Sequence, residues 1–195
     1  MNKPIYPTQL KGFLNGSITA FSVPLKGSAK WTLNGPIKKN DKTIGCSFFT
    51  SSGGAEYYFR YPVGTILVCR EPWKVVAPLT NNATGELGVF VGYKDKKTRL
   101  FDIGIKDVGK IKKLYGSSFQ PANHMPYAFS RCKRVVIANK VERARDLTVD
   151  DVRRVGINDF HFLALYADHF NAQHGTGSWE SNPWVERPTV RRIEG

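Results

Sequence analysis

Three separated segments of the chain place Trp, Arg and His at polar turns beside strand-like runs. They are residues 64–73, 124–131 and 177–185. Arg grips phosphate through a planar fork of donors, and Trp offers a flat face on which a planar ligand stacks. One Trp alone is more often a core residue, because an indole buries a large area. Three such segments in one chain predict a binding site for a planar or phosphorylated ligand.

The cations and indoles of these segments are the first candidate contacts. Arg70 and Arg131 are expected to hold phosphate, since Arg is favoured wherever phosphate is bound by two parallel hydrogen bonds. Trp73 and Trp179 are expected to offer stacking faces. The opposite interpretation for the two indoles is that they fill the core.

The remaining candidates are polar. His124 and Asn182 could read the polar edges of a base, and Glu71 joins the set as the neighbour of Arg70. Two alternatives stay open. Arg70 and Glu71 could form a structural ion pair, and His124 could act as an acid or base or could orient backbone through a hydrogen bond.

Charge is the strongest compositional signal. The 195 residues include 29 Lys and Arg against 16 Asp and Glu, a net charge of +13 with an isoelectric point near 9.8. The basic residues gather at 38–42, 94–99, 106–113, 131–134, 140–145, 153–154 and 187–192. Any one cluster could be a solvated surface. The whole set predicts a polyanionic partner, and nucleic acid is the first candidate.

Composition also excludes several classes of protein. Hydrophobic residues make up 41% of the chain, yet no apolar run reaches the 18 to 20 residues of a membrane span and no signal peptide opens it, so a cytoplasmic protein is expected. Cys46, Cys69 and Cys132 show no Cys-x-x-Cys spacing, which favours reduced, buried thiols over a disulfide framework or a zinc site. His161 and His169 lie eight residues apart, too far along a helix to share one ion. No metal or cofactor is expected.

The expected strands cover residues 17–23, 64–69, 87–93, 134–141 and 184–193. Pro188 should restrict the last strand to a sheet edge or split it. Turn-rich composition predicts hairpins and loops over 26–60, and residues 77–120 read as a second long excursion. The chain is expected to form a single domain over 1–195, with these two segments as loop insertions.

Helices are expected at three places. Thr8 could cap a short first helix, and Asp146 or Thr148 could cap a helix that ends at Gly156. A third helix follows Asp159. Its expected inward side chains recur every three or four residues: Phe160, Leu163, Tyr166, Ala167 and Phe170. Strands at both ends with helices between them predict an α+β domain around a mostly antiparallel sheet or small β-barrel.

Taken in order, the three segments and the stretch 141–156 resemble the phage and prophage branch of the activating signal cointegrator homology (ASCH) family. That branch carries Gly-Asp-x-Leu-x-Val-Arg-Glu-x-Trp, Ile-His-Met-Pro-x-x-x-Ser-Arg, Val-x-x-Leu-x-Asp-Ile and Gly-Ser-Trp-x-x-Asn-Pro-Trp segments in the same order. The resemblance covers about two thirds of the chain, mainly from Gly64 onward. It implies a PUA-like β-barrel flanked by helices, with a cleft for RNA or a modified nucleoside.

Some families of this fold are enzymes, and the resemblance implies where their catalytic residues would fall. In the amidohydrolase branch, which acts on acetylcytidine, a Gly-x-Lys-x-x-Thr turn supplies Lys and Thr, and a later helix supplies Glu. Aligned on Gly16, this chain has Ile18, Phe21 and Val155 at those positions. None of these side chains can serve as acid, base or nucleophile, so this catalytic scheme is not expected here.

The sequence therefore predicts a phage-type ASCH protein that binds RNA, or another single-stranded nucleic acid, through a basic cleft lined by Trp and Arg. RNA is favoured over DNA. One alternative is a nucleic-acid-processing enzyme, either a ribonuclease or a nucleoside amidohydrolase, with a site rebuilt around Glu71 and His124. Another is a host-takeover factor whose basic face binds an acidic host protein.

Overall fold

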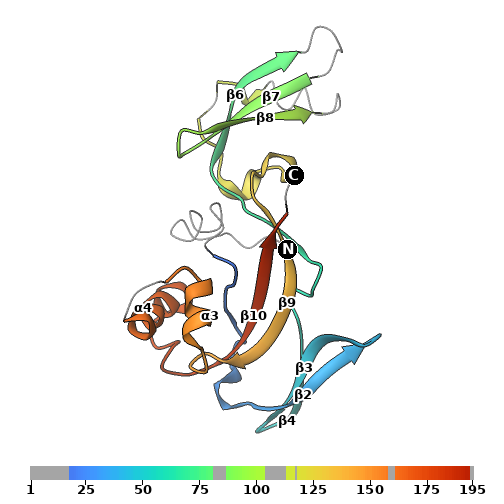
Figure 1. Ribbon diagram of the computed structural model, residues 1–195, viewed down its shortest axis with the longest axis vertical. Coiled ribbons are helices and arrows are strands. Elements are labelled where there is room, and N and C mark those ends of the chain that lie inside the picture. Colours follow the sequence, from blue (N-terminus) through green and yellow to red (C-terminus); the bar gives the residue numbers. More distant parts are fainter. Residues whose placement is uncertain (1–17, 81–86, 104–112, 117, 158–160, 194–195) are drawn as a thin grey trace. The chain divides into compact units, whose positions relative to one another are not determined.

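The computed structural model describes residues 18–80, 87–103, 113–116, 118–157 and 161–193 (Figure 1). The chain divides into two compact units. The described residues of unit 1 lie within 68–133, and those of unit 2 lie within 18–67 and 134–193. The described residues of unit 1 therefore lie, in the sequence, between two stretches of unit 2. The expected first helix after Thr8 falls outside the described residues.

Unit 2 contains two antiparallel sheets. The first has the strand order β1-β10-β9-β5, and the second is the meander β2-β3-β4. The strands are β1 (Val23–Pro24), β2 (Thr32–Lys39), β3 (Lys42–Thr50), β4 (Gly53–Tyr58), β5 (Ile66–Val68), β9 (Lys133–Arg143) and β10 (Trp184–Arg192). Segment 26–60, expected to be a loop insertion, thus contains a three-stranded sheet.

The helices of unit 2 are short. They are η1 (Ser28–Lys30), α3 (Val149–Arg154) and α4 (Phe162–His174). Thr148 caps α3 as expected: its side chain accepts a hydrogen bond from the Asp151 backbone, and the Asp151 carboxylate accepts one from the Thr148 backbone. Gly156 follows with a φ of 91°, the left-handed conformation that glycine adopts most readily.

The inward face of α4 is narrower than its sequence pattern indicates. Tyr166 and Phe170 are buried as expected, but Leu163 is 46% exposed. The two buried rings pack with Trp179 and with Val152 of α3 in one hydrophobic cluster. The expected cap Asp159 and the expected inward residue Phe160 lie outside the described residues.

Pro188 neither ends nor splits the last strand, contrary to the expectation. It lies opposite Asn139 in the β9–β10 ladder, which continues past it with a register shift between Thr189 and Val190. The backbone of Trp184 forms hydrogen bonds with Leu25 and with the Ser28 hydroxyl, so its N–H and C=O point to the side of β10 that faces away from β9. Because backbone direction alternates along a strand, Pro188 also points away from β9, and its missing N–H removes no bond from this ladder.

Unit 1 is built on one antiparallel meander. Its elements are β6 (Trp73–Thr80), β7 (Leu87–Tyr93), β8 (Thr98–Ile103), η3 (Ala122–His124) and η4 (Tyr127–Phe129). Apolar side chains from β6 and β7 meet others from the η3–η4 segment in one core. Its buried members are Trp73, Val75, Val89, Val91, Tyr93, Met125 and Phe129.

The described chain is therefore a mostly antiparallel β protein with few helices. Cys46, Cys69 and Cys132 are buried and form no disulfide bond, as their apolar neighbours predict. Among the described residues, no helix is both long enough and apolar enough to cross a lipid bilayer.

Candidate nucleic-acid interface

Arg131 lies at the centre of an ion-pair cluster in unit 1. Its Nε and Nη2 donate to the two carboxylate oxygens of Glu71, each at 2.7 Å, and Nη2 also lies 2.8 Å from Asp95. The guanidinium carbon lies 4.3 Å from the ring centroid of Tyr93. The Arg131 side chain is 12% exposed and that of Glu71 only 4%. The fork expected to bind phosphate is thus bound to two carboxylates.

Charge fixes the protonation of this cluster. Burial opposes ionisation of Asp95, but the hydrogen bond and charge of Arg131 outweigh it and lower the pKa of that carboxyl. Burial would likewise lower the pKa of Arg131, yet its bonds to Glu71 and Asp95 raise it. Asp95 belongs to the turn between β7 and β8, so the cluster connects this turn to the segment that precedes β6.

Trp73 was expected to offer a stacking face, and the structure corrects this expectation. The residue is 2% exposed, and its ring centroid lies 5.3 Å from that of Phe129 in the core of unit 1. Its position at the start of β6, paired with Tyr93 of β7, directs the indole inward. A fully buried indole leaves no face for a base.

The segment around His124 is mostly structural. Met125 is buried in the core, and its sulfur accepts a hydrogen bond from the Glu71 backbone at 3.5 Å. The Ser130 hydroxyl lies 2.9 Å from the backbone oxygens of both Cys69 and Cys132. His124 itself, the last residue of η3, remains exposed. Arg70, the remaining candidate of unit 1, is half-buried.

The two candidates of unit 2 take part in the turn between α4 and β10. Trp179 is half-buried, with its ring centroid 5.5 Å from Tyr166 and 5.8 Å from Phe170. Asn182 adopts a φ of 43°, and its side-chain oxygen accepts a hydrogen bond from the Arg145 backbone at 2.9 Å. Both residues shape this turn, which explains their spacing without a ligand.

Arg143 of β9 has a similar structural role. Its guanidinium donates to the backbone oxygens of Ala29, Trp31 and Asn182 at 2.7, 2.7 and 3.0 Å. It also lies 4.5 Å from the ring centroid of Trp184. These bonds connect the η1 loop to the turn before β10, so this cation of the basic cluster 140–145 is bound within the unit.

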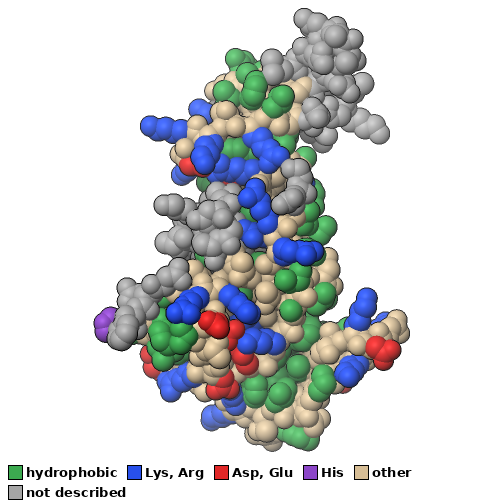
Figure 2. Space-filling model, viewed as in Figure 1, with side chains coloured by type: hydrophobic (Ala, Val, Ile, Leu, Met, Phe, Trp, Pro, Cys, Tyr) green, Lys and Arg blue, Asp and Glu red, His purple; other side chains and the backbone are tan. Residues whose placement is uncertain are grey.

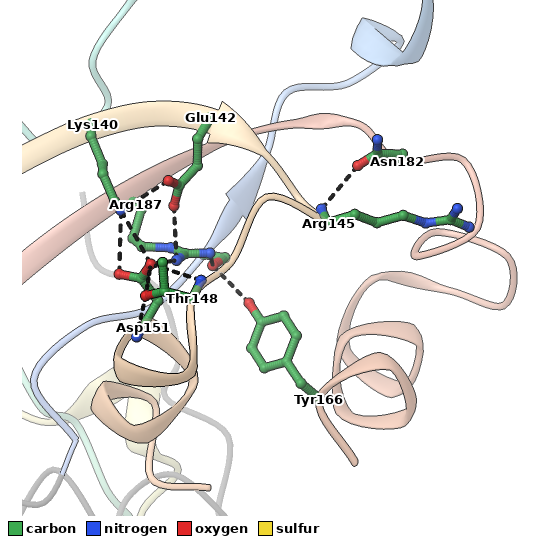
Figure 3. Close-up of polar contacts among 9 residues, drawn as sticks. Lys140, Glu142, Arg145, Thr148, Asp151, Tyr166, Asn182 and Arg187 are labelled. Atoms are coloured by element: carbon green, nitrogen blue, oxygen red, sulfur yellow. Dashed lines mark hydrogen bonds and ion pairs between the residues drawn. The ribbon is translucent and has the colours of Figure 1, made fainter. Parts of the chain in front are cut away.

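A polar network that the sequence analysis did not identify joins β9, β10 and α3 (Figure 3). Arg187 is 1% exposed, and its Nη1 lies 2.8 Å from Glu142 and 3.5 Å from Asp151. Lys140 lies 2.8 Å from Glu142 and 3.2 Å from Asp151. Two cations and two carboxylates make the network neutral overall. Its charges lie on two strands and one helix, so no local motif could have revealed it.

The hydroxyl groups around this network complete it. Thr148 Oγ1 donates to Asp151 at 2.7 Å, and the Tyr166 hydroxyl donates to Ser22, which also accepts from Arg187. Burial would raise the pKa of Asp151, but its hydrogen bonds with Thr148 and the charge of Arg187 lower it to about 2. Burial raises the pKa of Tyr166. At neutral pH Asp151 therefore stays deprotonated and Tyr166 stays protonated, which suits a structural role better than proton transfer.

The positions that the ASCH amidohydrolase pattern reserves for catalysis are apolar contacts. Ile18 and Val155 are 5% and 6% exposed, and the backbone beside Ile18 bonds to Arg154, the neighbour of Val155. Phe21 packs edge-on against Tyr61, with ring centroids 5.4 Å apart. In the described part of the chain, no group of three or more His, Cys, Asp or Glu could hold a metal ion.

In unit 1, exposed cations occur in the basic cluster 94–99 and not at the candidates Arg70 and Arg131. Lys94, Lys96, Lys97 and Arg99 are exposed around the β7–β8 turn, and none of them makes an ion pair with a described carboxylate. Figure 2 shows Lys and Arg side chains over this part of the molecule. Segment 68–133 as a whole carries 12 Lys and Arg against 5 Asp and Glu.

Unit 1 also has exposed aromatic rings, and half-buried lysines contact two of them. Tyr115, Phe119 and Tyr127 are 56%, 37% and 49% exposed. Lys74 lies 5.1 Å from the ring centroid of Phe119, and Lys133 lies 4.5 Å from that of Tyr127. The available sequence signal was Lys112 and Lys113 followed by Tyr115 and Phe119.

The chain matches no protein-family model, and comparisons with curated proteins and with solved structures find no match either.

Proposed function

We propose that this protein binds RNA, or another single-stranded nucleic acid, through the cationic and aromatic surface of unit 1. The proposal includes a PUA-like arrangement of the β strands, on the strength of the order of the ASCH-like segments. The mostly antiparallel strands of the described chain are compatible with it. No catalytic step is part of the proposal.

The observation that carries the proposal is the distribution of carboxylates in unit 1. Glu71 and Asp95 both bind Arg131, so they do not neutralise the exposed lysines around them. Unit 1 thus carries both exposed cations and exposed rings, the two features that single-stranded nucleic acids require for phosphate neutralisation and base stacking. Lys74 with Phe119, and Lys133 with Tyr127, bring both features to the same place.

Fluorescence anisotropy with a labelled 20-nucleotide RNA tests the proposal. Binding should weaken steeply between 50 and 200 mM salt, because each neutralised phosphate releases counterions. Lys94→Ala and Lys97→Ala should each lower the slope of log affinity against log salt by about 1. Arg153→Ala is the matched control, since Arg153 is an exposed cation of unit 2 that pairs with Asp150.

Three results would refute the proposal. They are the absence of binding, an affinity independent of salt, and an equal loss of affinity in the Arg153→Ala control. Cleavage of the probe would instead favour the nuclease alternative, and His124→Ala, which changes an exposed residue, would test that alternative separately.

A further inference from the structure

The β2-β3-β4 sheet of unit 2 exposes two aromatic rings. Phe49 of β3 and Tyr58 of β4 are 59% and 56% exposed, although large apolar side chains are more often buried. Gly45 lies opposite Tyr58, and Phe49 lies four residues further along the same strand. Since side chains alternate along a strand and opposite residues share a face, both rings belong to one face of the sheet, here called the outer face.

Packing on the other face prevents this orientation from reversing. Phe48 is 1% exposed, and its ring centroid lies 5.4 Å from Trp31 and 5.5 Å from Trp184. The Tyr57 hydroxyl donates at 2.5 Å to Glu186, a buried carboxylate of β10. A shift of one residue would bury Phe49 and expose Phe48, so the core holds the register that presents Phe49 and Tyr58.

Small residues keep both rings open. Gly54 lies opposite Phe49, and Gly45 lies opposite Tyr58. Gly45 is also required by the backbone, since a Cβ there would lie 2.2 Å from the Tyr57 oxygen. The Tyr58 hydroxyl donates to Glu56 at 2.8 Å, which restrains the ring before any ligand binds. Neither ring packs against another aromatic ring among the described residues.

Cations lie at the tip of the β2–β3 hairpin of the same sheet. Asn40 and Asp41 form a two-residue turn with φ of 49° and 59°, and exposed Lys38, Lys39 and Lys42 flank it. Figure 1 shows the hairpin extending beyond the β9–β10 ribbon of the same unit. Three lysines and one aspartate give this tip a net positive charge, which complements phosphate.

We propose that the outer face of the β2-β3-β4 sheet is a base-stacking platform, on which Phe49 and Tyr58 stack bases of a single-stranded nucleic acid while the hairpin lysines hold its phosphates. This inference rests on the proposed function and adds to it a second contact site, in unit 2. The register separates the two rings by four residues of strand, about 14 Å. That length equals about four phosphate spacings along one strand of a B-form duplex, so one short segment reaches both rings.

The platform selects single strands over duplexes. In a duplex each base is stacked on its neighbours and paired, so its ring face is not available to an exposed side chain. In a single strand every base can leave the stack and lie on Phe or Tyr, with little dependence on base identity. The proposed occupant is therefore a single strand and not a duplex.

The test uses the full chain with a labelled 12-nucleotide oligouridylate and a 12-base-pair RNA duplex. Phe49→Ala and Tyr58→Ala should each weaken binding of the single strand about tenfold and leave the salt slope unchanged. Phe49→Tyr and Tyr58→Phe should keep the affinity, because both retain a ring. Leu33→Ala is the matched control: Leu33 is 40% exposed on β2 but lies opposite Phe48, and therefore on the other face.

The outcomes separate the two proposals. Binding that survives both alanine substitutions, or that falls equally in Leu33→Ala, overturns the platform and leaves the proposed function standing. No binding by the unaltered protein overturns both. Sedimentation would show whether the protein self-associates and whether Phe49→Ala abolishes this. That result also overturns the platform, because the outer face would then bind a second copy of the chain. Crosslinking of 4-thiouridine to Phe49 or Tyr58 would support it directly.

Discussion

Replacement of Arg131 by Leu separates a structural role of this residue from a role in ligand binding. The substitution removes both 2.7 Å hydrogen bonds to Glu71 and leaves a carboxylate that is 4% exposed without its cation. Breaking one side of a buried ion pair costs about 3 to 5 kcal/mol. Asp95 adds little to this figure, since its side chain is 40% exposed and water can solvate it.

Hydrogen exchange of β7 is the suitable assay, because it reports the stability of unit 1 separately. Val89 and Val91 of β7 are fully buried in the same core. At about 1.4 kcal/mol per tenfold, their amides should exchange two to three orders of magnitude faster in Arg131→Leu when local opening limits exchange. Glu71→Leu combined with Arg131→Leu should restore most of the protection, since removal of both partners leaves no unpaired charge in the interior.

Two results would refute this reasoning. One is an exchange rate in Arg131→Leu within twofold of the unaltered protein. The other is a double variant that is no more protected than the single one. Normal exchange combined with lost oligonucleotide binding would return Arg131 to the phosphate-binding role that its sequence context predicts.

Three further substitutions have expected outcomes. In urea titrations, the stability advantage of the unaltered protein over Asp151→Asn should shrink by about 2 kcal/mol as the pH falls from 5 to 2. The pKa of Asp151 is about 2 in the folded chain against 3.8 ordinarily, so its contribution is complete above about pH 4 and is lost toward pH 2. A constant difference between the two proteins would contradict this. Trp73→Phe should change oligonucleotide affinity less than twofold, as anisotropy would measure, because the indole is buried; a tenfold loss would show that it contacts a base. Arg143→Lys should cost about 1 to 3 kcal/mol in thermal unfolding, since an ammonium cannot reproduce the fork to three carbonyls; an unchanged melting temperature would exclude that role.

Local signals in the sequence predicted much of the fold. The Thr148 cap, the stop at Gly156 and the β-branched run within β9 depend on neighbours along the chain, and the structure confirms them. Pro188 was misjudged because its effect depends on which side of the strand its nitrogen faces, and register alone decides that. Leu163 was misjudged because periodicity shows which residues share a helix face but not how far the neighbouring elements cover it.

The candidate site was harder to predict, for a physical reason. Arg and Trp bind ligands, but they also pair with carboxylates and fill cores, and sequence spacing does not distinguish these uses. Arg131 and Glu71 are 60 residues apart in the chain, yet they form a hydrogen-bonded ion pair with one another. The exposed rings of Tyr115 and Phe119 were overlooked because their segment contains no Trp or Arg.

Within the described residues, the chain passes between the units at two places, and these lie on neighbouring strands. In unit 2 the strands β5 and β9 are adjacent, and the Gly64 and Val136 backbones bond at 2.8 Å. The two hydrophobic clusters seen among the described residues of unit 2 are built from residues of that unit. Residues 68–133 therefore leave and re-enter unit 2 at adjacent strands. Replacing this segment by another one through recombination would leave the hydrophobic clusters of unit 2 unchanged.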